Sequence, residues 1–447
     1  MSDFNYSKDD DNIVSIMWDV KNKSMNVLTL DGLHSLKTCV ERALNDDSVK
    51  GIIISSPKKD FAGGMDLNVL KAMMSETDND FSKTAFQTIM DVHDVLRKLE
   101  LGGRDLKTKK PAKRVVWASS GLSAGIGTEI ALACHYRIAT NDPGTKIGLP
   151  EILVGLFPFG GGTTRLMRML GALGSSNILL EGKMLSAKAA KSSGLIDEIC
   201  NPSELMTKAK EWILTALDED LVKPWDKKGF KLPGGGPYHP SGFLTFVGAS
   251  AMVHAKTKGV YPAHKSLMAA AYSGLLVPFD TALKIEARWA VKLLNAPGTF
   301  NMINTLFVNK TALEKGANRP SNIKDQKTKK IGVIGAGMMG SGIAYVSSIA
   351  GIDVILIDSS QEKADQGKFK VKSILEQGIK RKKTTPEQMD VVLQRIFATS
   401  DYSSLRDVDL VIEAVFEDVA LKNQVTKLAE AHIQKATVFA TNTSTLP

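Results

Sequence analysis

Short apolar strands alternate with helical patterns along the first 200 residues. Residues 12–20 (NIVSIMWDV) alternate apolar and polar side chains, as a half-buried strand does. Residues 31–46 repeat apolar positions at helical spacing, and residues 49–56 (VKGIIISS) form the uninterrupted apolar run of a strand buried on both faces. The runs at 114–120 and 136–140 have the same character. The pattern predicts an α/β arrangement with glycine-rich connections.

The apolar spacing becomes helical between Pro202 and about Ala296. A loop rich in glycine and proline interrupts it at residues 231–242. Residues 300–316 predict one long helix, and the polar residues after them predict a linker. From Ile331 the pattern returns to strand, turn, helix and strand, which indicates a new domain.

These changes predict four segments: residues 1–205 as an α/β core, 206–299 as its helical extension, 300–328 as a linker helix and linker, and 329–447 as a nucleotide-binding domain. Residues 331–357 carry one charge, at Asp353, but six glycines interrupt the apolar run. A strand–turn–helix–strand unit explains this run better than a membrane span does.

The composition is that of a soluble globular protein of two or three domains, because 447 residues exceed one ordinary core. The net charge is +9, with basic clusters at residues 104–114, 223–231 and 324–330. These clusters fit either solvated loops or a field that attracts a phosphate-bearing ligand. The clusters at 104–114 and 324–330 contain no aromatic residue, and no cluster belongs to a known nucleic-acid-binding module, so we do not expect nucleic acid as a partner.

Three widely separated cysteines, Cys39, Cys134 and Cys200, favour a reducing compartment over a disulfide framework, and we expect no metal site. The polar, acidic N-terminus is neither a secretory signal nor a transit peptide. We therefore expect a cytoplasmic protein with at most peripheral membrane association. We also expect that the cytoplasm is bacterial.

A glycine motif begins the last domain, where a β-branched run leads into GAGMMG. Gly335 permits a tight turn, Gly337 lets a pyrophosphate approach the backbone, and Gly340 lets the following helix pack on the strand. The helix N-terminus attracts phosphate. Asp358 ends the next strand, where it can accept hydrogen bonds from ribose hydroxyls, so the motif predicts NAD rather than NADP.

Two carboxylates in the first half lie in apolar, glycine-rich surroundings. Glu129 opens an apolar helix, and Glu151 follows a proline and precedes an apolar run. Carboxylates placed together in an apolar pocket have pKa values that are raised and pushed apart, which suits paired acid and base catalysis. The neighbouring glycines leave backbone N–H groups that could stabilise an oxyanion. The alternatives are a helix-dipole partner for Glu129 and a capping carboxylate for Glu151.

The motifs GAGMMG, VIEAVFEDVALK and TNTST resemble the 3-hydroxyacyl-CoA dehydrogenase family in order and spacing. The resemblance implies that seven residues besides the glycines lie along the NAD or substrate path: Met339, Asp358, Val415, Phe416, Glu417, Lys422 and Ser444. Met339 could instead be a core residue, Glu417 and Lys422 an ordinary surface pair, and Ser444 a turn residue.

The chain departs from that family at its end. The family's catalytic histidine lies some twenty residues past the serine motif, whereas this sequence stops at Pro447. The one histidine of residues 329–447, His432, precedes the last predicted strand, and we expect it on a helix surface. We therefore expect a chain truncated at its C-terminus, which holds a partial Rossmann domain without the dehydrogenase base and the helical domain that closes over the substrate.

The first 200 residues resemble the crotonase, or enoyl-CoA hydratase, family through FAGGMDL, SSGLSAGIGTEIALACHYRIA and KIGLPEILVGLFPFGGGTTRL. The resemblance implies a ββα spiral fold. It places the two oxyanion N–H groups on Met65 and Ile126, and it makes Glu129 and Glu151 the catalytic pair. The implied reaction is syn addition of water to a trans-2-enoyl-CoA, whose phosphates give the basic balance a use.

A crotonase module, a helical linker and a dehydrogenase module follow one another in the multifunctional α-subunits of fatty acid β-oxidation. The resemblance implies a hydratase with an NAD-binding dehydrogenase module, an acyl-CoA substrate and a thiolase β-subunit as an open partner. Two alternatives stay open: a crotonase that acts mainly as a 3,2-enoyl-CoA isomerase, and an acyl-CoA-binding scaffold for a thiolase.

Overall fold

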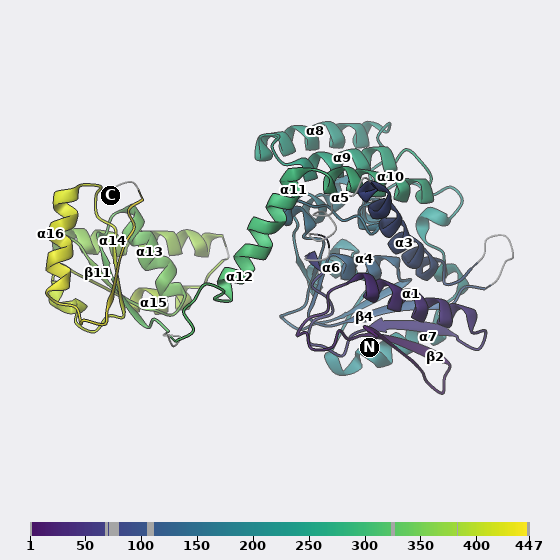
Figure 1. The fold of residues 1–447 in the computed structure, drawn as a ribbon, viewed down its shortest axis with the longest axis horizontal. Helices are drawn as coiled ribbons and strands as arrows, with labels where there is room; N and C mark the ends of the chain where they lie inside the picture. The colour runs from purple at the N-terminus through teal and green to yellow at the C-terminus, as the bar shows by residue number, and fades with distance from the viewer. Residues whose placement is uncertain are drawn as a thin grey trace. The chain divides into compact units, whose positions relative to one another are not determined.

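The computed structural model describes residues 2–67, 70, 80–104, 111–322, 327–381 and 383–444. The chain divides into two compact units, residues 1–318 and 319–447, which are described separately (Figure 1). Among the described helices, none combines the length and the apolar character needed to cross a membrane. The segments of the basic clusters at 105–110 and 324–326 lie outside the described residues.

A six-stranded sheet forms the centre of the first unit, in the order β1-β2-β3-β4-β6-β9. Its strands are β1 (Phe4–Lys8), β2 (Ile13–Trp18), β3 (Gly51–Ser55), β4 (Arg114–Ser119), β6 (Tyr136–Thr140) and β9 (Glu198–Cys200). Only the β1–β2 pair is antiparallel. Every residue of β3 is buried, as its unbroken apolar run predicts for a parallel strand covered on both faces.

Both faces of this sheet carry a core. Alternate residues such as Ile52 and Trp117 face the main core, which is built with α1 (Leu30–Asn45), α3 (Phe81–Leu101) and α4 (Ile126–Ala133). Their sequence neighbours, such as Ile53 and Val116, face the opposite side and pack on α7 (Leu205–Thr215). A small second sheet has the order β5-β7-β8, with β5 (Leu122–Ala124), β7 (Lys146–Gly148) and β8 (Leu185–Ser186).

Helices complete the first unit. They are α5 (Gly162–Leu179), α6 (Ala187–Ser193), α8 (Pro240–Thr257), α9 (Pro262–Gly274), α10 (Phe279–Leu294), α11 (Pro297–Met302) and α12 (Lys310–Glu314). Short 3₁₀ turns lie at η1 (Glu151–Val154), η2 (Pro202–Glu204), η3 (Asp218–Leu221) and η4 (Pro224–Asp226). Figure 1 shows α8, α9 and α10 side by side above the sheet region.

Two elements differ from the sequence prediction. The strand β1 was not predicted, because FNYSK offers only Phe4 and Tyr6 as apolar positions; its pairing with β2 across a turn makes it a strand. The long helix predicted at 300–316 is interrupted by a π-helical stretch, η5 (Ile303–Asn309). Its wider turns leave Ile303 in the core and bring Phe307 to a cavity wall, a tertiary effect that helical spacing does not reveal.

The second unit is a five-stranded parallel sheet in the order β12-β11-β10-β13-β14. Its strands are β10 (Lys330–Ile334), β11 (Asp353–Ile357), β12 (Ile396–Thr399), β13 (Leu410–Glu413) and β14 (Val438–Thr441). One face packs on α13 (Met338–Ile349), α14 (Gln361–Lys380) and α15 (Pro386–Gln394), and the other on α16 (Val419–Glu430) and the 3₁₀ turn η6 (Tyr402–Leu405). The strand order reverses beside β10, which is where such sheets bind ligands.

Candidate functional site

A cavity of about 460 Å³ in the first unit brings together all four residues predicted for its chemistry, Met65, Ile126, Glu129 and Glu151. Its wall is mainly apolar and includes Leu28, Leu70, Ile89, Val92, Val154, Phe157, Leu294 and Phe307. Lys23 also lines the cavity, where it forms an ion pair with Asp66. A deep apolar cavity with a few polar groups is the usual form of a small-molecule site.

The segment that carries Met65 is held by a residue that the sequence did not point to. Asn26 is fully buried, and its amide nitrogen donates to the carbonyls of Trp18 and Phe61. The ladder beside Met65 uses the N–H groups of Leu28 and Asp66, which leaves the Met65 N–H out of that pairing. Since Met65 also lines the cavity, its N–H is a candidate donor to a ligand there.

Ile126 is the first residue of α4, so its N–H has no acceptor inside the helix. Gly125 before it has φ +57°, a conformation that glycine adopts without strain. A Cβ at Gly125 would also lie 2.9 Å from Oε1 of Glu151. Glycine is therefore required here both by the backbone turn and by the approach of the second carboxylate.

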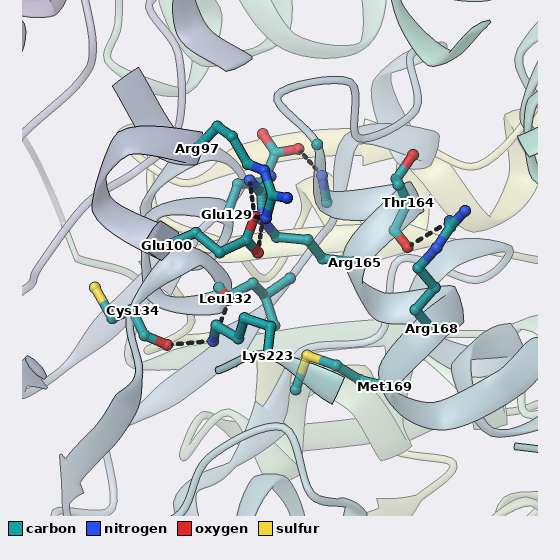
Figure 2. Close-up of polar contacts among 12 residues, drawn as sticks. Arg97, Glu100, Glu129, Leu132, Cys134, Thr164, Arg165, Arg168, Met169 and Lys223 are labelled. Atoms are coloured by element: carbon teal, nitrogen blue, oxygen red, sulfur yellow. Dashed lines mark hydrogen bonds and ion pairs between the residues drawn. The ribbon is translucent and has the colours of Figure 1, made fainter. Parts of the chain in front are cut away.

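Glu129, one turn into α4, is 3% exposed. Its Oε1 accepts a hydrogen bond of 2.8 Å from the Gly162 N–H at the start of α5 (Figure 2). Glycines at 160 and 162 leave room for the carboxylate, because a Cβ at either position would lie 2.6 Å from one of its oxygens. The glycines of residues 159–162 (FGGG) therefore leave the space that the Glu129 side chain occupies.

Glu151 begins the short turn η1 on the other side of the cavity. The side chain as a whole is partly exposed, but its Oε2 is buried and has no hydrogen-bond partner among the described residues. A buried carboxylate oxygen without a donor favours the protonated form. The capping alternative does not account for this placement, since Glu151 makes no side-chain cap to its own turn. Glu129 does lie in the first turn of α4, as its helix-dipole alternative requires.

The carboxylates of Glu129 and Glu151 interact electrostatically. Burial, the charge of Glu151 and the charge of Glu286 raise the pKa of Glu129 well above its usual value, whereas the Gly162 N–H lowers it. Burial raises the pKa of Glu151 to about 8, against a lowering by its own backbone N–H and with a smaller raising by the charge of Glu286. The Gly162 N–H stabilises the ionised form of Glu129, whereas the buried Oε2 of Glu151 has no donor among the described residues, so we assign the shared proton to Glu151.

An ion-pair network lies behind the cavity. Arg165 and Glu100 are both fully buried, with Nε of Arg165 2.9 Å from Oε1 of Glu100. Arg97 contacts the same carboxylate at 2.8 Å and pairs with Asp226 at 2.7 Å. Figure 2 shows the Arg97, Glu100 and Arg165 side chains beside Glu129. The Arg165 charge lowers the pKa of Glu129, so this network favours its ionised form.

Two members of the basic clusters are neither solvated nor available to a ligand. Lys113 and Lys223 are each 7% exposed. Lys113 donates to the carbonyl of Asp46, and Lys223 donates to the carbonyls of Leu132 and Cys134 at the end of α4 (Figure 2). Both interpretations of the clusters are therefore wrong for these two lysines, which satisfy buried carbonyls instead.

The glycine motif of the second unit has the geometry that its spacing predicts. Gly335 has φ +99°, and a Cβ there would lie 2.6 Å from the carbonyl oxygen of Ala414. A Cβ at Gly340 would overlap the carbonyl oxygen of Gly335. At Gly337, the N-cap of α13, a Cβ would meet nothing within 4 Å. That open space beside a helix N-terminus fits the phosphates of a dinucleotide.

Asp358 lies at the end of β11 and is joined to the glycine turn. Its Oδ2 accepts from the Ala336 N–H at 2.7 Å, and its Oδ1 accepts from the Ser359 N–H at 2.7 Å. A carboxylate has about four lone-pair sites, so acceptor capacity for ribose hydroxyls remains. The contact to Ala336 also fixes the position of the turn relative to this carboxylate.

The segment after β13 is organised by Glu413, which sequence reasoning missed. Glu413 is 1% exposed, accepts from the Val415 N–H at 2.7 Å and pairs with Lys422 at 2.9 Å. Thr441 at the end of β14 donates to its other oxygen at 2.7 Å. The ion pair of Lys422 is thus with Glu413, so the surface pair with Glu417 that was left open is wrong. The sequence offered one signal for this pair, because Glu413 precedes Lys422 in the same segment as Glu417 and is a second possible partner for it.

The remaining predicted residues of this unit lie at or near the same edge of the sheet. Glu417 is exposed and accepts a hydrogen bond from the Thr443 hydroxyl at 3.2 Å, which joins the ends of β13 and β14. Met339 is 51% exposed, so the core alternative is wrong for it, and Phe416 is 80% exposed. Ser444 is exposed in a bend. His432 is exposed, as predicted, but it lies in a turn after α16 and not on a helix, and its Nδ1 donates a hydrogen bond to the Leu428 carbonyl.

Comparison with known proteins matches each unit to a family. The enoyl-CoA hydratase/isomerase family model matches residues 10–220, and the model of the 3-hydroxyacyl-CoA dehydrogenase NAD binding domain matches residues 330–447. Two fatty acid oxidation complex α subunits, from Shewanella halifaxensis (strain HAW-EB4) and Shewanella baltica (strain OS185), are 32% and 31% identical over 99% of this chain. The chain spans about 60% of the length of these curated relatives.

Solved structures match as well. The crystal structure of an enoyl-CoA hydratase from Bacillus halodurans is 20% identical, with a TM-score of 0.48; the match covers 68% of this chain and 99% of that one.

Proposed function

We propose that the chain combines a domain of the enoyl-CoA hydratase/isomerase family at residues 10–220 with an NAD-binding domain of the 3-hydroxyacyl-CoA dehydrogenase family at residues 330–447, and that it acts in fatty acid β-oxidation. The first unit hydrates trans-2-enoyl-CoA thioesters. The second unit binds NAD. The product of the hydration, a 3-hydroxyacyl-CoA, belongs to the class of substrate that gives the second family its name.

The proposal rests above all on one observation: two coupled carboxylates and two candidate oxyanion donors line the same cavity. The N–H groups of Met65 and Ile126 polarise the thioester carbonyl, so negative charge develops on its oxygen. Ionised Glu129 takes a proton from water as the oxygen of that water bonds to C3. Protonated Glu151 gives its proton to C2. One water is added in total, and the proton then returns from Glu129 to Glu151 through solvent.

The apolar wall of the cavity suits an acyl chain, and the exposed lysine at its mouth suits the phosphates of CoA. Lys23 is the candidate for that contact, because its side chain is 46% exposed. The basic residues that are buried, Lys113 and Lys223, have no part in it.

In the second unit, the residues present fit a dinucleotide. Bound NAD would supply hydride acceptance. The N–H groups at the start of α13 and the space beside Gly337 would hold the pyrophosphate, and Asp358 would hold the adenosine ribose. The Val415, Phe416, Glu417 and Ser444 segments would border the nicotinamide side, since they follow β13 and β14 at the same sheet edge.

The hydratase proposal is tested with the full chain and trans-2-enoyl-CoA substrates of increasing length, by the loss of the absorbance of the conjugated thioester. We expect turnover in the wild type and a loss of about a hundredfold or more in both Glu129→Gln and Glu151→Gln. Glu211→Gln, an exposed glutamate on α7, is the matched control. Absence of hydration by the folded wild type, or full activity in both variants, would exclude the proposal.

The same samples decide between the alternatives. A 3-enoyl-CoA substrate separates isomerisation from hydration, because isomerisation creates the conjugated absorbance that hydration removes. A scaffold without chemistry would show neither signal.

Three further points are part of the proposal. The name of the relatives supports a multi-subunit complex, and a thiolase β-subunit is the partner to test by co-sedimentation. The free thiols of Cys39, Cys134 and Cys200 support a cytoplasmic placement, because a reducing compartment keeps thiols free. The finer division at residues 205, 299 and 328 is to be tested by limited proteolysis.

A further inference from the structure

Glu286, on α10, reaches the start of α5, which also holds Glu129. Its Oε1 accepts from the Gly161 N–H at 2.6 Å. Its Oε2 accepts from the Thr164 N–H at 2.8 Å and from the Thr164 hydroxyl at 2.6 Å. The side chain is 1% exposed. The buried carboxylate of Glu286 thus accepts three hydrogen bonds, which satisfy it away from water.

Glu286 supplies the N-terminal cap that α5 lacks. Its N-cap residue is Gly161, which has no side chain to satisfy the first N–H groups of the helix. Glu286 caps Gly161 and Thr164, and Glu129 takes the N–H of Gly162 between them. The carboxylates of Glu286 and Glu129, which come from α10 and α4, therefore both bind the N-terminus of α5. A shift of that terminus would move the donors of both carboxylates.

Among the described residues, no Lys or Arg forms a salt bridge with Glu286. His93 on α3 lies 3.7 Å away, but its Nε2 is hydrogen-bonded to the Phe159 carbonyl at 2.7 Å, which requires a proton donated by the ring. Arg165 on α5 is engaged with Glu100, and Arg168 on α5 bonds to the carbonyls of Gly274 and Val277. Glu129 on α4 and Glu151 on η1 complete the charged surroundings.

We propose that Glu286 is a positioning residue of the hydratase site, which fixes the glycine terminus of α5 and through it the Glu129 carboxylate, and which adds a further negative charge beside the catalytic pair. The proposal rests on the proposed hydratase function. It assigns Glu286 no contact with substrate, because it does not line the cavity that holds Glu129 and Glu151.

The charge of Glu286 affects the pKa values of the catalytic pair. The negative charge of Glu286 raises the pKa of both Glu129 and Glu151. A third carboxylate beside the pair therefore keeps the proton of Glu151 on the acid at neutral pH, where hydration needs it. Removing the charge lowers both pKa values and shifts the whole pH–rate profile toward acid.

The test is the pH dependence of kcat and kcat/KM in the full chain with the variants Glu286→Gln and Glu286→Asp. Glu286→Gln removes the charge and presents an NH₂ group to one set of donors. We expect kcat to fall by roughly tenfold or more, KM to stay within about threefold, and both limbs of the profile to move to lower pH. Glu286→Asp keeps the charge but withdraws the carboxylate, so kcat falls while the limbs keep their wild-type positions.

A merely structural role would lower the melting temperature and the active fraction but leave the pH limbs of Glu286→Gln unchanged, and that result would overturn the proposal. Wild-type kcat in Glu286→Asp would overturn it as well, and this variant decides the matter if Glu286→Gln does not fold. Glu211→Gln again serves as the control. The hydratase function is judged separately: if the wild type turns over and Glu129→Gln does not, that function stands whatever the Glu286 variants do.

Discussion

A methyl group on Gly160 would lie 2.6 Å from Oε2 of Glu129, the carboxylate oxygen that the Gly162 N–H leaves free. Gly160→Ala must therefore displace the carboxylate or the α5 terminus. Misplacing a catalytic group by about 1 Å costs on the order of a hundredfold in rate. We expect kcat for hydration to fall by about that factor, measured in steady state with saturating enoyl-CoA.

The matched control is Gly298→Ala in α11, where a Cβ would meet nothing within 4 Å. It should keep wild-type kcat and stability. If Gly160→Ala also kept wild-type kcat, the placement of Glu129 against this glycine would be wrong.

The hydration rate should fall as the pH rises through the pKa of Glu151. This carboxyl has to be protonated to deliver its proton to C2, and burial raises its pKa to about 8. Above that pH, kcat should decrease about tenfold per pH unit, because only the protonated fraction is active. A rate that is constant from pH 7 to pH 10 would contradict the assignment of Glu151 as the acid.

The same carboxyl makes the stability of the first unit depend on pH. The pKa of Glu151 is 4.5 when unfolded and about 8 when folded, so its contribution is fully present below about pH 4.5 and is lost as the pH rises to about 8. Glu151→Gln cannot ionise. Its melting temperature relative to the wild type should therefore rise between pH 5 and pH 9, by roughly 2 °C or more. Scanning calorimetry at the two pH values checks the sign, and an equal difference at both would refute it.

The elements of this fold follow largely from local patterns. The unbroken apolar run at β3 and the alternation at β2 identify two strands by themselves, and the glycine spacing identifies the turn after β10. The two glutamates that we propose as the catalytic pair could not be identified from such a pattern alone, since only their apolar surroundings and the resemblance indicated them. Nothing local could identify Glu286, because the nitrogen that it caps is 125 residues away in the sequence. Tertiary partners of this kind are decided by packing and not by pattern.

The pair of Lys422 and Glu413 should be important for the stability of the second unit. Glu413 is 1% exposed on its side chain and Lys422 15% exposed. Lys422→Met leaves a buried carboxylate without its cation, which costs on the order of 3 kcal/mol. Urea denaturation should show this loss, whereas Lys427→Met, an exposed lysine on the same helix, should stay within about 0.5 kcal/mol. A double variant that adds Glu413→Gln should recover part of the stability; failure to do so would mean that the charge is not the cause.

Two glycines of one motif should respond differently to the same substitution. A Cβ at Gly340 would overlap the Gly335 carbonyl oxygen, so Gly340→Ala should destabilise the second unit by about 1–3 kcal/mol through overpacking. At Gly337 a Cβ would meet nothing within 4 Å, so Gly337→Ala should leave the urea midpoint unchanged. Its methyl group would nevertheless occupy the space where a pyrophosphate approaches the backbone. We expect Gly337→Ala to raise the Kd for NAD at least tenfold at wild-type stability, measured by calorimetric titration of the full chain. Wild-type NAD affinity in Gly337→Ala would show that the phosphates do not approach α13 at this residue, and the NAD site would have to lie elsewhere on the sheet edge.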